Sequence, residues 1–209
     1  MKRTAFHRAI AVAAIVGAAT LGVAPASSAA MSNNSLVSVL TGGPTGLDAD
    51  AADYDILTAA VQAVLTGKPD SSVKVLADGT VPLTAFLPTD QAFINLVTAL
   101  TGSRPATEEA TFNTVAGLGL DTVEQILLYH VVPGKAIASG AALMANGAAL
   151  KTALPGKVIK VKVTKAPSII LGDYNTALRN PRVILGQVDI NKGSAQIAHG
   201  INAVLLPSA

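Results

Sequence analysis

A change of hydrophobic periodicity midway along the chain is the feature that most constrains its fold. In the first half, apolar residues recur at helical spacing, as in the segments 53–65 and 93–100. In the second half they alternate with polar residues, most clearly over residues 158–165. Because the helices precede the strands instead of alternating with them, the sequence predicts an α+β fold.

A strand followed directly by a capped helix is predicted in the first half. The segment 82–88 is mostly apolar and carries a proline at each end. The side chains of Thr89 and Asp90 then offer oxygens to cap the N-terminus of the next helix. Phe93 opens the apolar face of that helix, and Gly102 is expected to end it.

A further helix is expected to begin at Thr107-Glu108-Glu109 and to stop at Gly117 and Gly119, and the helix after it is expected to carry a histidine on its apolar face. Asp121 and Glu124 stand in the relation of a capping box, with Asp in place of the usual Ser or Thr. The spacing places His130 on the same face as the preceding apolar residues, and Pro133-Gly134 is expected to end the helix. We therefore expect His130 to be buried, with its ring hydrogen-bonded within the domain.

The rest of the chain is assigned from residue types. Residues 31–52 are rich in Ser, Asn, Gly and Pro and are expected to form a linker or a loosely packed lead-in. Residues 136–150 are rich in Ala and Gly and are weakly helical. Three further strand candidates lie at residues 168–171, 182–190 and 197–206. No internal repeat interrupts this order, so a single domain is expected.

Residues 1–30 have the composition of a secretory signal peptide of bacterial type. A positive start precedes an uncharged apolar run over residues 9–24, and small residues follow. Cleavage is expected between Ala26 and Ala30. The run is shorter than the ~20 residues that a membrane-spanning helix needs. Export with cleavage is therefore expected, with no membrane span afterwards.

Loss of the leader changes the charge of the chain. The whole sequence has 15 basic and 13 acidic residues, a net charge of +2. Removing the three basic residues of the leader leaves 12 against 13, a net charge of −1. A domain without a basic field is not expected to bind nucleic acid. The absence of cysteine excludes disulfides, thiolate metal sites and a cysteine nucleophile.

Two histidines, His130 and His199, are the residues that most suggest chemistry. A metal site would require both of them to converge with a carboxylate. Both lie in apolar runs without a neighbouring acid. A buried neutral histidine that is hydrogen-bonded to the backbone or to a hydroxyl is the favoured interpretation, and the metal site is the alternative.

Other catalytic arrangements receive less support from the sequence. Ser139 has no neighbouring base and no nucleophile-elbow motif, so it is interpreted as a helix cap. The acidic groups Glu108-Glu109 and Asp48, Asp50 and Asp53 stand in a first helical turn and in the lead-in, where solvent exposure is expected. No catalytic residue, cofactor site or metal site is assigned, and the chain is not expected to be an enzyme.

Three separated stretches resemble the signature motifs of fasciclin (FAS1) domains. They are residues 84–93, residues 127–134, and Asp189-Ile190 with residues 199–207, and their order and spacing agree with the family. Two sites depart from it: the family usually has Asn-Gly where this chain has Ala195-Gln196, and Asp where it has Asn202. The residues to which the resemblance assigns a structural role are Thr89, Asp90, Phe93, Tyr129, His130, Pro133, Gly134, Asp189, Ile190, His199 and Pro207.

The resemblance implies a single domain over residues 53–207, with helices mainly from the first half packed on a β-sheet wedge formed mainly by the second. It implies a secreted, non-catalytic module for adhesion or for association with the cell envelope or matrix, possessing no cofactor. Its partner would be a cell-surface or extracellular-matrix protein or glycan. An extracellular carrier of an apolar small molecule, a lipid or pigment, is the alternative. The oligomeric state is left open.

Overall fold

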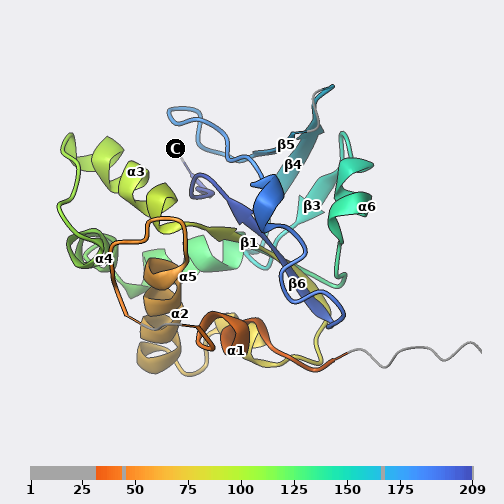
Figure 1. The fold of residues 1–209 in the computed structure, drawn as a ribbon, viewed down its shortest axis with the longest axis horizontal. Coiled ribbons are helices and arrows are strands. Elements are labelled where there is room, and N and C mark those ends of the chain that lie inside the picture. Colours follow the sequence, from red (N-terminus) through yellow and green to blue (C-terminus); the bar gives the residue numbers. More distant parts are fainter. Residues whose placement is uncertain (1–31, 44–45, 166–167, 209) are drawn as a thin grey trace, which may run out of the picture. The chain divides into compact units, whose positions relative to one another are not determined.

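The computed structural model describes residues 32–43, 46–165 and 168–208, so the predicted signal peptide lies outside the described residues. Its helices and two three-stranded sheets form the α+β fold that the sequence predicts (Figure 1). The helices are α1 (Leu36–Leu40), α2 (Asp55–Gly67), α3 (Asp90–Thr101), α4 (Glu108–Ala116), α5 (Leu120–Tyr129) and α6 (Ser139–Leu143), with 3-10 turns η1 (Ser72–Ala77) and η2 (Leu185–Gln187). The strands are β1 (Leu83–Pro88), β2 (Val131–Pro133), β3 (Ala149–Lys151), β4 (Val158–Val163), β5 (Ile169–Gly172) and β6 (Gln196–Ile201).

Strand β1 is the centre of the first sheet, whose order is β2-β1-β6. It pairs with β2 in the antiparallel sense and with β6 in the parallel sense, from Leu83 opposite Gln196 to Pro88 opposite Ile201. The second sheet, β3-β4-β5, is antiparallel throughout. Residues 182–183 form single bridges to β5 and β6 and thereby connect the two sheets.

All residues of β1 are buried because the strand is covered on both faces. Leu83, Ala85 and Leu87 belong to a core shared with helices α2, α3, α4 and α5. Phe86 faces a second core, formed with residues of β4 and β5 such as Ile159 and Leu171. Figure 1 shows the corresponding order of helices, first sheet and second sheet.

The helical faces follow the predicted spacing. In α2 the buried residues include Ile56, Ala60 and Val64, and in α3 they include Phe93 and Leu96. Thr107 caps α4 by accepting a hydrogen bond from the backbone N–H of Ala110 (3.1 Å). None of the helices in the described residues is long and apolar enough to cross a membrane.

The N-terminal lead-in is more tightly attached than its composition suggests. Leu36 in α1 is fully buried, and its backbone N–H donates to the side-chain oxygen of Gln196 (2.8 Å). The amide nitrogen of Gln196 donates to the carbonyls of Val75 and Asp78 (2.7 Å each). Gln196, one of the departures from the family motif, thus joins α1 and η1 to the end of the first sheet.

Two sequence expectations about the ends of α5 are wrong. Helix α5 ends at Tyr129, before Pro133-Gly134, because residues 131–133 leave the helix to pair with β1. The capping box at Asp121 and Glu124 does not form, since α5 starts after Gly119 and both carboxylates pair with Lys68.

The strand expected over residues 182–190 is also wrong. Isolated bridges and the turn η2 occupy this segment. Likewise the last strand ends at Ile201, short of the expected residue 206. An apolar segment can therefore be buried here without forming a strand ladder, a distinction that hydrophobicity alone does not make.

Candidate functional site

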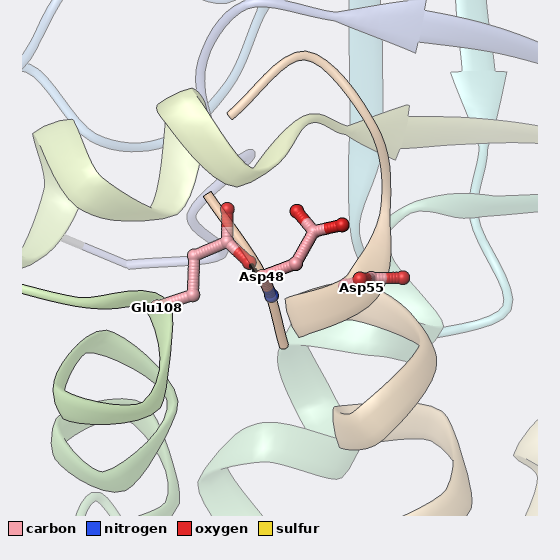
Figure 2. Close-up of side chains that lie close together, drawn as sticks. All are labelled: Asp48, Asp55 and Glu108. Carbon is pink, nitrogen blue, oxygen red and sulfur yellow. Dashed lines mark hydrogen bonds between the residues drawn. The ribbon is translucent and has the colours of Figure 1, made fainter. Parts of the chain in front are cut away.

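The helices α2, α3 and α4 each begin with an acidic residue, namely Asp55, Asp90 and Glu108. The fold brings these three helix starts together with two aspartates of the segment before α2. We call the five residues Asp48, Asp53, Asp55, Asp90 and Glu108 the acidic cluster. Within it, ligand oxygens of Asp48, Asp55 and Glu108 lie within 4.8 Å of one another, as do those of Asp53, Asp90 and Glu108. Figure 2 shows the first of these groups.

Asp90 caps a helix, but a different one from that predicted. Its carboxylate accepts hydrogen bonds from the backbone N–H groups of Asp55 (3.1 Å) and Ile56 (3.0 Å), at the start of α2. Thr89 occupies the N-cap position of α3 without a side-chain hydrogen bond to that helix. The expectation that these two side chains cap α3 is therefore wrong, because the carboxylate points to the neighbouring helix.

Three buried carboxylate oxygens of the acidic cluster have no hydrogen-bond partner. They belong to Asp53 (Oδ1), Asp55 (Oδ2) and Glu108 (Oε1). Glu108 is only 4% exposed, and its other oxygen accepts a hydrogen bond from the backbone N–H of Asp48 (2.8 Å). Asp55 is 8% exposed. Buried polar groups are nearly always hydrogen-bonded, so such a concentration of unpaired oxygens is unusual.

The electrostatics of the acidic cluster favour its neutralisation. Burial is the main cause that raises the pKa of Asp55, Asp90 and Glu108, and repulsion from neighbouring carboxylates raises each further. The adjacent carboxyl group of Asp53 also raises the pKa of Asp90. The ion pairs of the described residues join Lys68 to Asp121 and Glu124, and Lys192 to Asp189, and so leave the cluster without a basic partner.

The solvent exposure expected for the acidic groups is confirmed for Asp48, Asp50 and Glu109. It is wrong for Glu108, which is buried and accepts a hydrogen bond from the lead-in backbone at Asp48. An acidic residue in the first turn of a helix is common, because it interacts favourably with the helix dipole while remaining in solvent. The sequence signal that could have indicated the cluster is that α2, α3 and α4 all start with an acidic residue.

His130 is buried, as predicted, and both of its ring nitrogens are engaged. The Nδ1–H group donates to the carbonyl of Ile126 (2.7 Å), and Nε2 accepts from the backbone N–H of Leu205 (3.0 Å). Burial lowers the pKa of His130 to about 4. The neutral ring therefore links α5 to the closing segment of the chain.

His199 makes a separate connection within β6. Its Nε2–H group donates to the carbonyl of Ile137 (2.8 Å), and its Nδ1 accepts from the backbone N–H of Asp189 (3.3 Å). The carboxylate of Asp189 accepts hydrogen bonds from the backbone N–H (2.7 Å) and the hydroxyl (2.8 Å) of Ser139. Asp189, not Ser139, thus caps α6. With all four ring nitrogens bound to backbone, neither histidine offers a lone pair to a metal.

The other motif residues lie at the junctions of elements. Tyr129 is fully buried, and its hydroxyl donates to the carbonyl of Val158 (3.0 Å). Gly134 has φ of 95°, and its N–H donates to the carbonyl of Pro82 (2.8 Å). Ile190 forms a bridge with Ala198. Pro133 ends β2, Phe93 is buried in α3, and Pro207 is half-buried near the C-terminus.

A surface groove runs along α3, and we call it the α3 groove. It has a volume of about 340 Å³ and lies between α3 and the segment 178–182. Its walls carry apolar residues such as Leu96 and Leu178, and also Arg179, Asn180 and Asn202. A more open hollow of about 580 Å³ adjoins it through Asn95 and Asn202 and reaches the segment 50–52 next to the acidic cluster.

Apolar spaces between the elements are much smaller. The pocket between the two sheets, beside Phe86 and His199, holds about 20 Å³, and that beside His130 holds about 10 Å³. Each is at most the size of one water molecule. The described core is therefore closely packed around both histidines.

The α+β fold and the three motifs together define a domain of the fasciclin class. The family profile described as Fasciclin domain matches residues 56–207, and the chain belongs to this family. A similar solved structure is a FAS1 domain pair from the insect cell adhesion molecule Fasciclin I. It shares 16% sequence identity over 73% of this chain and 43% of that chain, with a TM-score of 0.44. This chain thus spans less than half of that structure's length.

No curated protein matches the chain. Fasciclin domains are typically adhesion-related binding modules outside the cell or at its surface, and they are generally non-catalytic.

Proposed function

We propose that this protein is a secreted binding module that mediates cell adhesion or association with the cell envelope or extracellular matrix, without catalysing a reaction. The observation that carries the proposal is the fasciclin match over residues 56–207. The leader-like composition of residues 1–30 supports secretion. The engagement of His130 and His199 by backbone groups supports a non-catalytic role, because neither ring is left to act as a general base.

The α3 groove is the surface that we assign to the partner, a cell-surface or matrix protein or glycan. The amide groups of Asn95, Asn180 and Asn202 offer N–H donors to a partner, while their oxygens accept hydrogen bonds within the domain. Arg179 adds an exposed cation, and Leu178 adds an exposed apolar contact. Such a mixture suits recognition of a polar chain by hydrogen bonds, with apolar contacts beneath it.

The alternative function, carriage of an apolar small molecule, is not supported by a pocket of suitable size among the described apolar spaces. The apolar spaces beside Phe86, His130 and His199 hold about 20 Å³ or less. Pockets that bind small molecules are typically larger by more than tenfold. A lipid or pigment would have to open the core in order to enter it.

The proposal is tested by measuring saturable binding of the purified protein to arrayed glycans and to immobilised matrix proteins. Arg179→Glu reverses a charge in the α3 groove without removing a hydrogen bond from the fold. We expect this variant to weaken binding to the identified partner by tenfold or more, as measured by surface plasmon resonance. The loss of an interface arginine commonly has an effect of this size.

The matched control is Lys162→Glu, which reverses an exposed charge on β4, away from the α3 groove. It should bind as the wild type does. Equal weakening by both substitutions would show a non-specific charge effect and refute the assignment of the groove. Turnover of ester, glycan or peptide substrates that is lost in His130→Ala would refute the non-catalytic role.

A further inference from the structure

The geometry of the acidic cluster matches the coordination shell of a hard cation. Oxygens of Asp48, Asp55 and Glu108 lie within 4.8 Å of one another. Ligand oxygens bound to Ca²⁺ at 2.3–2.6 Å are separated by about 5 Å at most, so one ion can contact all three. Figure 2 shows that they come from the segment before α2, from α2 and from α4. Asp48 is exposed, which leaves a path from solvent.

A second observation also indicates a ligand. Asp55 and Glu108 are more than nine-tenths buried, and each directs an unpartnered oxygen into the acidic cluster. The Asp55 carboxylate accepts no hydrogen bond and joins no ion pair within the described part of the chain. A buried carboxylate is costly unless it is paired, protonated or bound to a metal.

The groups already present do not balance the charge. Five carboxylates converge, and the starts of α2, α3 and α4 each contribute roughly +0.5 elementary charge. The three helix starts together offset roughly +1.5 of the charge of five carboxylates, and no ion pair among the described residues reaches the cluster.

We propose that the acidic cluster binds one Ca²⁺ ion through Asp55 and Glu108 as its buried ligands and Asp48 as its solvent-side ligand. The ligands are all carboxylate oxygens, with no nitrogen or sulfur that would favour zinc or copper. Ca²⁺ binds several carboxylates in variable geometry, whereas Mg²⁺ demands an octahedron and usually keeps several waters, so a group of three carboxylates favours Ca²⁺.

The ion would fasten the segment before α2 to the starts of two helices. That segment continues into residues 50–52, which line the open hollow beside the α3 groove. Calcium binding would therefore hold one wall of this surface in place. The proposal does not depend on the identity of the partner, since the site lies behind the surface and not within it.

The test is thermal unfolding and titration calorimetry of chelator-treated protein with CaCl₂ and, separately, MgCl₂. We expect one equivalent of Ca²⁺ to bind with a Kd between about 10 μM and 1 mM. At a hundredfold excess over Kd, the unfolding midpoint should rise by roughly 5–10 °C. Glu108→Gln and Asp55→Asn should each weaken binding at least tenfold. Measuring both variants guards against a folding defect in one of them.

Glu109→Gln is the matched control, because Glu109 is the exposed neighbour of Glu108 in the same helical turn. It should retain the wild-type response. Identical unfolding midpoints with chelator and with Ca²⁺ would overturn the site and assign the compensation to protons. An equal response to Mg²⁺ would overturn the assignment to calcium, and an unchanged response in Glu108→Gln would overturn the ligand set.

Discussion

His130 connects the end of α5 to the closing segment of the chain. The hydrogen bond from Leu205 to Nε2 requires a neutral ring with its proton on Nδ1. Protonation of Nε2 would place two N–H groups face to face in a site that is 4% exposed. Its role in the fold therefore depends on the neutral form.

This requirement predicts acid sensitivity. The pKa of His130 is lowered from 6.5 to about 4 by burial. Its stabilising contribution is fully present above pH 6.5, where the residue is neutral in both states. It is lost progressively as the pH falls from about 6.5 through about 4, because the unfolded chain takes up the proton first. The loss should approach about 3 kcal/mol.

Denaturant unfolding of the wild type and His130→Gln between about pH 7 and pH 4 measures this loss. The difference in unfolding free energy between the two proteins should shrink as the pH falls, because Gln does not titrate. All other titrating groups are common to both. A constant difference across the range would contradict the prediction.

At the residue scale, the sequence predicted the burial of the histidines better than the burial of the acidic residues. The apolar spacing around His130 predicts its burial directly, since an amphipathic helix has one inner face. The acidic cluster requires three helix starts to converge, and nothing local at Asp55 or Glu108 indicates which starts meet. Asp90 is a second example. The sequence predicted that it caps a helix, but it caps α2 and not α3, which it begins.

The packing of the helices and strands depends in part on side chains of one element that form hydrogen bonds to the backbone of another. Gln196 in β6 is fully buried and makes hydrogen bonds to α1, to Val75 in η1 and to Asp78 directly after η1. Its replacement by Ala leaves the buried N–H of Leu36 without a partner and removes one of the two hydrogen bonds that each of the Val75 and Asp78 carbonyls accepts. We expect Gln196→Ala to lower the free energy of unfolding by about 2–4 kcal/mol.

Hydrogen exchange at the Leu36 amide provides a local measurement of this effect, because that N–H donates to Gln196. The exchange rate should rise in Gln196→Ala. Gln125→Ala, at an exposed position of α5, is the control and should leave the rate unchanged. Equal protection of Leu36 in both variants would show that α1 is held by other contacts.

At the element scale, periodicity predicted the interiors of helices and strands but not their ends. The strand 82–88 and the alternation of β4 were predicted because each has a strong pattern on a buried face. The end of α5 was missed because pairing of residues 131–133 with β1 outweighs continuation of the helix. Partner strands are tertiary information, which a local stop signal does not contain.

Within the described domain, β1 joins the two cores. Leu57 belongs to the core on the helical side, and Ile159 to the core between the sheets. Because β1 contributes to both, neither core can be lost without exposing the other. We expect heat unfolding to be a single cooperative transition.

Differential scanning calorimetry of Leu57→Ala and Ile159→Ala tests this coupling. Each substitution should destabilise the protein by about 2–5 kcal/mol and shift the same single peak. Two separated peaks, with each variant moving only one, would contradict the coupling. The sequence predicted the α+β class but gave no indication that one strand serves both cores.

The parallel pairing of β1 with β6 also determines when a growing chain can fold. Residues 83–88 acquire their β6 neighbour only after residues 196–201 have been synthesised. Until then the strand at the centre of the first sheet has one unpaired edge. Bringing β6 to β1 also closes a loop of more than a hundred residues, roughly, which is slow. A polypeptide that stays unfolded until its last segment emerges can be threaded through a translocon before folding, as secretion of this protein would require.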